Sequence, residues 1–219
     1  MNPVVLIADL VRSRDIPERA QFQKRLSATL QALSVQSAES LLSPYTLTLG
    51  DEFQAVHADF RRILPDCLRI LAELAPVRAR FALAAGPLST EINPVAALEM
   101  DGPAFLRARE LLGELKTQSR NVIQVGWAEG ADPGLVNAAL GLLAGTMEGW
   151  KPVTLRLFRH LLDGRSVDEM AALLGMTPRG VYKHIAGRHL QEARTLLKLA
   201  GQELDGRLGR EAGEGREAT

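Results

Sequence analysis

Several features that mark common protein classes are scarce in this chain. It has 219 residues, of which one is cysteine (Cys67) and only 5% are aromatic. A single cysteine excludes a disulfide framework and a multi-cysteine zinc site. Because Cys67 lies in a helical pattern, we expect it to be a small buried hydrophobic residue, and we expect the protein to be cytoplasmic.

Long apolar segments are also missing. No run of about 18 apolar residues occurs, which excludes a transmembrane helix and predicts no membrane partner. The short apolar run near the N-terminus has no basic leader and no small-residue cleavage site, which is typical of a strand rather than of a signal peptide. With 46% hydrophobic and 24% charged residues, the composition is that of a folded globular protein.

The net charge of the whole chain is zero, but the charges are unevenly distributed along it. Lys and Arg total 26, and Asp and Glu also total 26. Residues 1–150 hold 14 basic and 17 acidic residues, a net charge of −3, whereas residues 151–200 hold 9 and 4, a net charge of +5. This asymmetry predicts two modules, of which the second has an anionic partner.

The pattern of residues 1–148 predicts one α+β domain. The expected strands are residues 4–8, 45–49, 53–57, 77–85 and 122–127, with Gly50-Asp51 at the tip of a hairpin. The expected helices are residues 18–40, 59–75, 93–116 (with a break at 101–103) and 133–145. This order suggests a sandwich with helices on one face of a sheet.

Residues 150–200 predict a second, all-α domain. Its expected helices are residues 154–163, 167–174 and 178–185. Ser166 and Glu169 can form a capping box, and Gly175 permits a sharp left-handed turn, so the pattern is that of a helix–turn–helix. Glycine and charged residues dominate the segment 205–219, which predicts a disordered tail.

The predicted helix–turn–helix carries candidate DNA-binding residues. Its second helix presents polar and basic side chains that can reach phosphates or base edges in a major groove. These candidates are Thr177, Arg179, Tyr182, Lys183 and Arg188. The pattern resembles sigma-factor region 4 and response-regulator output domains over about 40 residues. The alternative is a three-helix bundle used for protein contact or dimerisation.

Two aspartates are candidate metal ligands in the first domain. Asp9 ends the first strand, and Asp51 lies at the hairpin tip. If the two strands are neighbours, their carboxylates converge at one sheet edge, where oxygen ligands suit Mg²⁺. Such a site would serve phosphoryl or nucleotidyl transfer. The alternatives are a helix cap or loop anion for Asp9 and an ordinary turn residue for Asp51.

The chain resembles class III nucleotide cyclases in its strand ending Ala-Asp-Leu-Val and its hairpin Leu-Gly-Asp-Glu-Phe. That resemblance implies a ferredoxin-like nucleotide-cyclase-type domain in which Asp9, Asp51 and the Leu10 carbonyl hold Mg²⁺. More closely, the chain resembles the SatD family of bacterial proteins through VVLIADLVRSR, LTLGDEFQAV, RFALAAGPLSTEINP and DGPAFLRARELL.

The chain also departs from the cyclase pattern. Leu47 stands where those enzymes have a base-reading Lys, and Phe105 stands where they have an Asn that orients the ribose. An ordinary adenylate or guanylate cyclase is therefore not expected. The resemblance leaves Arg107 and Arg109 as phosphate contacts.

The loop after Asp9 carries Arg12, Ser13 and Arg14. In a cyclase-like core this loop faces the triphosphate, so these residues are further candidates for nucleotide binding. The alternative is a solvated loop. Glu52 is expected to point away from the metal edge, because neighbouring strand residues face opposite sides of a sheet.

Three functions remain open. The first is a DNA-binding regulator whose N-terminal domain binds a nucleotide, with or without Mg²⁺, or serves as a dimerisation platform. The second is a Mg²⁺-dependent nucleotidyltransferase or cyclase-like enzyme that uses Asp9 and Asp51. The third is a protein-interaction scaffold. A homodimer is expected, because cyclase-type domains usually pair and helix–turn–helix proteins commonly contact two half-sites.

Overall fold

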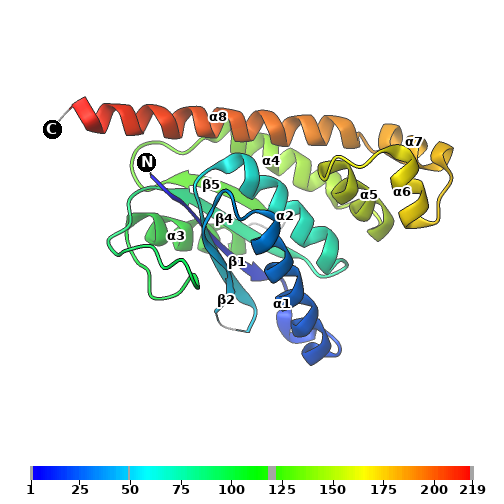
Figure 1. Ribbon diagram of the computed structural model, residues 1–219, viewed down its shortest axis with the longest axis horizontal. Coiled ribbons are helices and arrows are strands. Elements are labelled where there is room, and N and C mark those ends of the chain that lie inside the picture. Colours follow the sequence, from blue (N-terminus) through cyan, green and yellow to red (C-terminus); the bar gives the residue numbers. More distant parts are fainter. Residues whose placement is uncertain (1, 49, 118–121, 218–219) are drawn as a thin grey trace.

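The computed structural model describes residues 2–48, 50–117 and 122–217, and side chains up to residue 210. It contains one five-stranded sheet with helices around it (Figure 1). The strands are β1 (Val4–Leu10), β2 (Leu41–Leu47), β3 (Glu52–His57), β4 (Ala79–Ala85) and β5 (Ile123–Trp127). The helices are α1 (Arg19–Gln36), α2 (Phe60–Leu74), α3 (Pro103–Thr117), α4 (Gly134–Met147), α5 (Pro152–Leu162), α6 (Val167–Leu174), α7 (Pro178–Gly187) and α8 (Leu190–Glu217), together with the short 3-10 helix Ser13–Asp15.

The sheet has the strand order β2-β3-β1-β4-β5. β1 is antiparallel to β3 and β4, and β5 is parallel to β4. The first six elements therefore follow the β-α-β-β-α-β order of the split βαβ, or ferredoxin-like, arrangement. The predicted α+β character and the hairpin at Gly50-Asp51 are confirmed. Leu49, which was assigned to the hairpin, Met1 and residues 218–219 lie outside the described residues.

Helices cover both faces of the sheet, so the prediction of helices on one face was wrong. Val5 and Ile7 pack with Phe105 of α3 in one apolar cluster, whereas Leu6 and Ala8 belong to the cluster that contains α1 and α2. The reason is visible in β1, where all seven residues are buried. A strand without polar alternation needs cover on both sides.

The segment before α3 is not helical, although a helix was predicted from residue 93. The Asn93 side chain accepts hydrogen bonds from the backbone N–H groups of Val95 (2.9 Å) and Ala96 (3.2 Å), which is a local turn that competes with a helix. The next stretch joins β2 instead, since the Ala97 N–H donates to Thr46 Oγ1 at 2.8 Å. Helix α3 begins only at Pro103, a favourable first-turn residue.

The C-terminal helices share a core with the sheet domain. The larger apolar cluster runs without interruption from Phe53 and Phe81 of the sheet to Phe158 of α5 and Val181 of α7. Cys67 of α2 is fully buried in this cluster, as predicted, and burial raises the pKa of its thiol. The two predicted modules are therefore packed firmly against each other.

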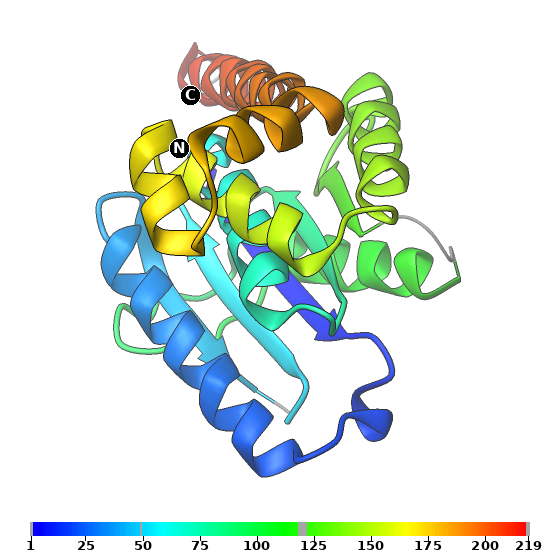
Figure 2. The same cartoon turned by 90° about the vertical axis from the view of Figure 1, so that its right-hand side faces the viewer.

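Helix α8 corrects the prediction of a disordered tail from residue 205. The helix continues to Glu217 and crosses the same side of the molecule as α2 and α4 (Figure 2). Leu204 and Leu208 are buried, which a pattern rich in glycine and charge conceals. Gly201 permits the close approach, since a Cβ there would lie 3.0 Å from the Arg61 Cα. None of the described helices is long and apolar enough to cross a bilayer.

Asp205 fastens α8 to the start of α2, and its removal should destabilise the protein. Its carboxylate accepts hydrogen bonds from the Phe60 N–H (2.7 Å) and Arg61 Nε (2.6 Å). We expect Asp205→Ala to lower the free energy of unfolding by about 1–2 kcal/mol, the usual cost of a lost helix-capping carboxylate. Urea denaturation measures this effect. Glu203→Ala, at an exposed position of the same helix, is the control, and an equal loss for both variants would contradict the assignment.

Candidate functional site

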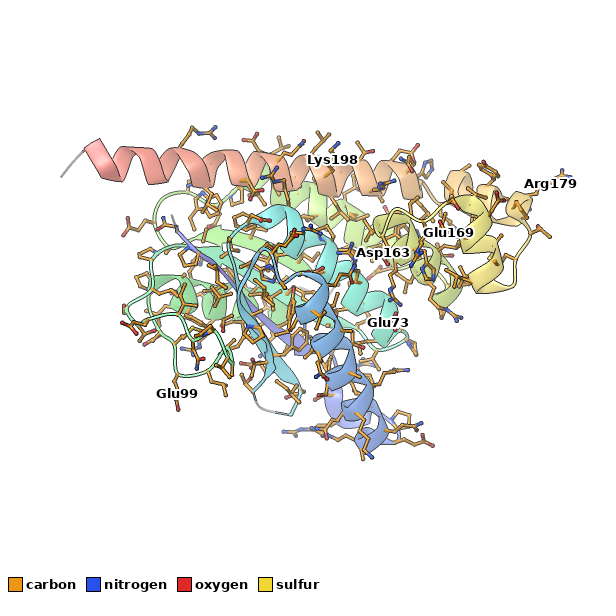
Figure 3. All side chains as sticks on the ribbon, viewed as in Figure 1. Glu73, Glu99, Asp163, Glu169, Arg179 and Lys198 are labelled. Atoms are coloured by element: carbon orange, nitrogen blue, oxygen red, sulfur yellow. The ribbon has the colours of Figure 1, made fainter. Side chains whose placement is uncertain are left out.

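The two predicted sites lie far apart in the molecule. The end of β1 and the tip of the β2–β3 hairpin lie at one edge of the sheet, namely the edge where β1 ends and β3 begins. Helices α6 and α7 lie at one end of the molecule, and the C-terminus of α8 lies at the other end (Figure 1). Arg179 of α7 points outward at that end, away from the rest of the chain (Figure 3).

Asp9 lies opposite Glu52 of β3 and Arg80 of β4 in the strand register. Directly opposed residues of adjacent strands share one face of a sheet. Glu52 thus lies on the same face as Asp9, so the prediction that it points away from Asp9 was wrong. Asp51 lies one position earlier, after Gly50, whose φ of +66° is the left-handed conformation that glycine tolerates.

The Asp9 carboxylate is held by two cations. Arg80 Nη1 lies 3.1 Å and Lys116 Nζ lies 3.4 Å from Asp9 Oδ2. The second oxygen of Asp9 lies 3.4 Å from the same Arg80 nitrogen. The Asp9 side chain is only 11% exposed, so these contacts are shielded from water. Asp9 thereby ties the end of β1 and the start of β4 to the last turn of α3.

Asp51 contacts the loop that follows β1. The Ser13 hydroxyl donates a short hydrogen bond to Asp51 Oδ2, and the Leu10 N–H donates to the Asp51 carbonyl at 3.0 Å. The structure thus brings together three of the predicted residues, Leu10, Ser13 and Asp51. Arg12 and Arg14 of the same loop are exposed, and Arg12 adopts a left-handed conformation with φ of 54°.

Magnesium does not fit this arrangement of Asp9 and Asp51. The donor atoms are of the right kind, since carboxylate and carbonyl oxygens suit Mg²⁺. However, a cation at Asp9 would have to displace Arg80 and Lys116, because both lie against the carboxylate. Within the described ranges, no group of three or more His, Cys, Asp or Glu residues is placed to hold a metal ion.

Of the two predicted phosphate contacts on α3, Arg107 is engaged in ion pairs within the chain. Arg107 is paired with Glu110, Glu114 and Asp132, and these hydrogen bonds and charges raise the pKa of its guanidinium against the effect of burial. Arg109 is exposed and forms no ion pair with a described residue. Phe105 is fully buried in the core.

Arg80 and Lys116 are the residues at this edge that sequence reasoning missed. The alternation of β4 offered a signal for Arg80, because Arg80, Ala82 and Ala84 share a face. That face is covered by α3 and also carries Asp9. No sequence pattern pointed to Lys116, because its side chain reaches Asp9 only through the packing of α3 on the sheet.

Helices α6 and α7 are joined by a turn of three residues, Gly175 to Thr177. Ser166 and Glu169 form the predicted capping box at the start of α6. Gly175 has φ of 62°, and the Met176 N–H donates to the Ala171 carbonyl at 2.9 Å. The Thr177 hydroxyl caps α7 by accepting the Gly180 N–H at 3.1 Å. Local hydrogen bonds therefore fix the turn, as the sequence predicted.

One face of α7 is basic and exposed. The five predicted DNA-binding residues, Thr177, Arg179, Tyr182, Lys183 and Arg188, are all exposed. Tyr182 is 62% exposed, which is unusual for a residue with a large apolar ring. Arg179, Lys183 and Arg188 form no ion pair with any described residue, whereas Arg69, Arg80 and Arg107 of the first domain all do.

Comparison with known proteins gives the family of the first domain. Residues 3–122 match the model of the SatD family. The chain belongs to the SatD family. The match covers β1 to α3 and the segment up to β5, so SatD membership says nothing about α6 and α7. No curated protein matches the chain.

Solved structures give more distant likenesses to this SatD protein. A bacterial light-regulated adenylyl cyclase is 17% identical with a TM-score of 0.41, over 57% of this chain and 75% of that chain. The guanylate cyclase domain of RhGC from Catenaria anguillulae, in complex with GTP, is 14% identical with a TM-score of 0.37, over 57% and 78%. Likenesses at this level support no statement about activity.

Proposed function

We propose that this SatD protein is a DNA-binding regulator that contacts DNA through α7. One observation carries the proposal. The exposed face of α7 presents Arg179 and Lys183 beside Tyr182, and no carboxylate of the described residues neutralises either cation. Cations that are already solvated and unpaired lose little when they bind a phosphate, and the release of counterions from DNA drives the binding.

The surroundings of α7 support this proposal. Residues 151–200 carry a net charge of +5, whereas residues 1–150 carry −3, so the positive potential is concentrated at this end. Pro178 and Gly180 leave few side chains at the start of α7 for reading bases. Phosphate contacts should therefore dominate the affinity, with limited sequence preference from this helix.

We propose dimerisation, rather than metal–nucleotide binding, as the role of the remainder of the chain. The pairing of Asp9 with Arg80 and Lys116 argues against a Mg²⁺ site there. A two-fold pair would present two copies of α7 to two half-sites. Helix α4 supports this proposal, because it carries no charged residue and exposes Leu135 (86%) and Leu142 (73%) to solvent.

The proposal is tested by removing two charges from α7. We expect Arg179→Ala/Lys183→Ala to weaken binding to duplex DNA between about tenfold and a hundredfold at about 0.1 M salt, because two phosphate contacts are lost. Fluorescence anisotropy with a labelled duplex measures the affinity. The control is Lys24→Ala/Arg109→Ala, which removes the same charge from exposed sites on α1 and α3. Equal losses for both double variants would reject α7 as the contact surface.

The enzyme alternative makes a different prediction. A ligand at 100 times its dissociation constant stabilises the folded state by about 2.7 kcal/mol, which a thermal-shift assay detects. We expect no shift of the melting temperature by Mg²⁺ or Mn²⁺ with any of the four NTPs. A metal-dependent shift that is lost in Asp9→Asn/Asp51→Asn would instead favour a nucleotidyltransferase or cyclase-like site at the sheet edge.

A further inference from the structure

A cavity of about 410 Å³ lies where the sheet domain meets the C-terminal helices. Its walls come from the end of α2, the starts of β4 and β5, the end of α4 and the start of α5. Small-molecule sites typically occupy about 300–1,000 Å³ and often lie at such junctions. The volume is therefore that of a site for one small ligand.

Apolar side chains form most of this cavity. Leu71, Val77, Met147, Trp150 and Leu155 contribute to the wall. Met147 is flexible and polarisable, so it can adjust to the shape of a bound apolar group. Trp150 is held edge-on against Phe158, with ring centroids 5.2 Å apart, and thus forms a fixed part of the wall. Such a lining fits an aliphatic or aromatic ligand body.

The polar groups of the cavity are incompletely paired. The closest approach of Arg78 Nη1 to Glu148 Oε1 is 3.7 Å, which is longer than a hydrogen bond, and both side chains are about 40% exposed. A planar guanidinium can bind a carboxylate through two parallel hydrogen bonds, which Glu148 does not provide here.

We propose that this cavity binds a small monocarboxylic acid with an apolar body. The carboxylate pairs with Arg78 in place of the loose contact to Glu148, and the apolar body packs against Trp150, Met147 and Leu155. The ligand then bridges α2 and the Trp150 segment, which leads directly into α5. Through α5 it contacts the part of the chain that carries α7.

The test uses the two tryptophans of the chain as reporters. In a ¹⁵N-labelled sample each indole N–H gives one resonance, and Trp127, which does not line the cavity, serves as the internal control. We expect sodium octanoate, and separately sodium benzoate, to shift the Trp150 resonance saturably and to leave that of Trp127 in place. n-Octanol, which has the same chain length without the charge, should bind at least about tenfold more weakly.

Two variants test the role of Arg78. We expect Arg78→Gln to weaken octanoate binding at least about tenfold, because the charged partner is lost. Arg62→Gln is the matched control, since Arg62 is 48% exposed and forms a similarly long ion pair (3.6 Å to Glu39) outside the cavity. Absence of a saturable Trp150 shift with both acids, or unchanged binding by Arg78→Gln, would overturn the proposal.

This inference stands apart from DNA binding, since the titration contains no DNA. A saturable shift with no effect of octanoate on DNA affinity would keep the site but remove its link to α7. Only that link rests on the proposed function.

Discussion

Asp66→Ala is expected to lower the free energy of unfolding by about 3–5 kcal/mol. Asp66 is fully buried on α2 and accepts hydrogen bonds from Ser37 Oγ (2.6 Å), Tyr45 Oη (3.1 Å) and Arg69 Nη1 (2.8 Å). Alanine would leave three buried donors without this acceptor, at about 1–3 kcal/mol each, and removal of one partner from a buried ion pair has a similar total cost. Chemical denaturation measures the loss.

The control for Asp66→Ala removes only one of the hydrogen bonds that this carboxylate accepts. Ser37→Ala removes one donor and leaves Asp66 with Tyr45 and Arg69, so we expect a loss of about 1 kcal/mol. Burial raises the pKa of the Asp66 carboxyl, while the hydrogen bond from Ser37 and the charge of Arg69 act in the opposite direction. Similar losses for Asp66→Ala and Ser37→Ala would contradict the central place of Asp66 in this network.

This network also joins the two parts of the chain. Arg69 Nε donates to Asp163 Oδ1 at 2.8 Å, and Asp163 directly follows the last residue of α5. Arg159 of α5 pairs with Glu73 of α2 beside it. The placement of α5 against α2 therefore depends on charged contacts as well as on the apolar core. The orientation of α7 should change when these contacts are broken.

Acid is expected to destabilise the protein through His57. Burial lowers the pKa of the His57 imidazole from 6.5 to about 3. Its Nε2 lies 3.1 Å from Tyr45 Oη, and its Nδ1 has no partner among the described residues. Between these two pKa values the unfolded chain binds a proton that the folded chain does not. The free energy of unfolding therefore falls as pH falls, by about 1.4 kcal/mol per pH unit from this residue.

Asp66 acts against His57 in this range. The pKa of the Asp66 carboxyl is raised in the folded state, so as pH falls this carboxyl is protonated in the folded chain before it is protonated in the unfolded chain. Protonation of Asp66 therefore favours folding as pH falls. The two contributions are separated by ¹H–¹⁵N NMR of the imidazoles, with the exposed His189 as reference. We expect His57 to stay neutral down to acid unfolding. A His57 titration near pH 6.5 in the folded protein would contradict this account.

Local patterns in the sequence were sufficient for much of the fold. Strand β1, the hairpin at Gly50 and the capped helices α6 and α7 are each encoded within about ten residues, by apolar runs, turn residues and capping side chains. The same local signals placed the exposed residues of α7 correctly. Contacts between distant segments were not accessible in this way.

Three features were missed because they depend on contacts between segments that are distant in the sequence. The tail was predicted to be disordered, but α8 is fixed there by Asp205 contacting α2 and by two buried leucines. The segment 93–100 was predicted to be helical, but it bonds to β2 and β3. The ion pairs of Asp9 were not foreseen, because its partners Arg80 and Lys116 come from elements that are about 70 and 107 residues further along the chain. Tertiary packing overrides local preference at each place.

The salt dependence of DNA binding tests the central proposal most directly. Log affinity against log salt concentration falls with a slope of about 0.9 per phosphate contact. Comparison of the unmodified protein with Arg179→Ala/Lys183→Ala on one duplex should show a slope smaller in magnitude by about 1.8 in the variant. An unchanged slope in the variant, or no salt-dependent DNA binding by the unmodified protein, would contradict DNA contact by α7.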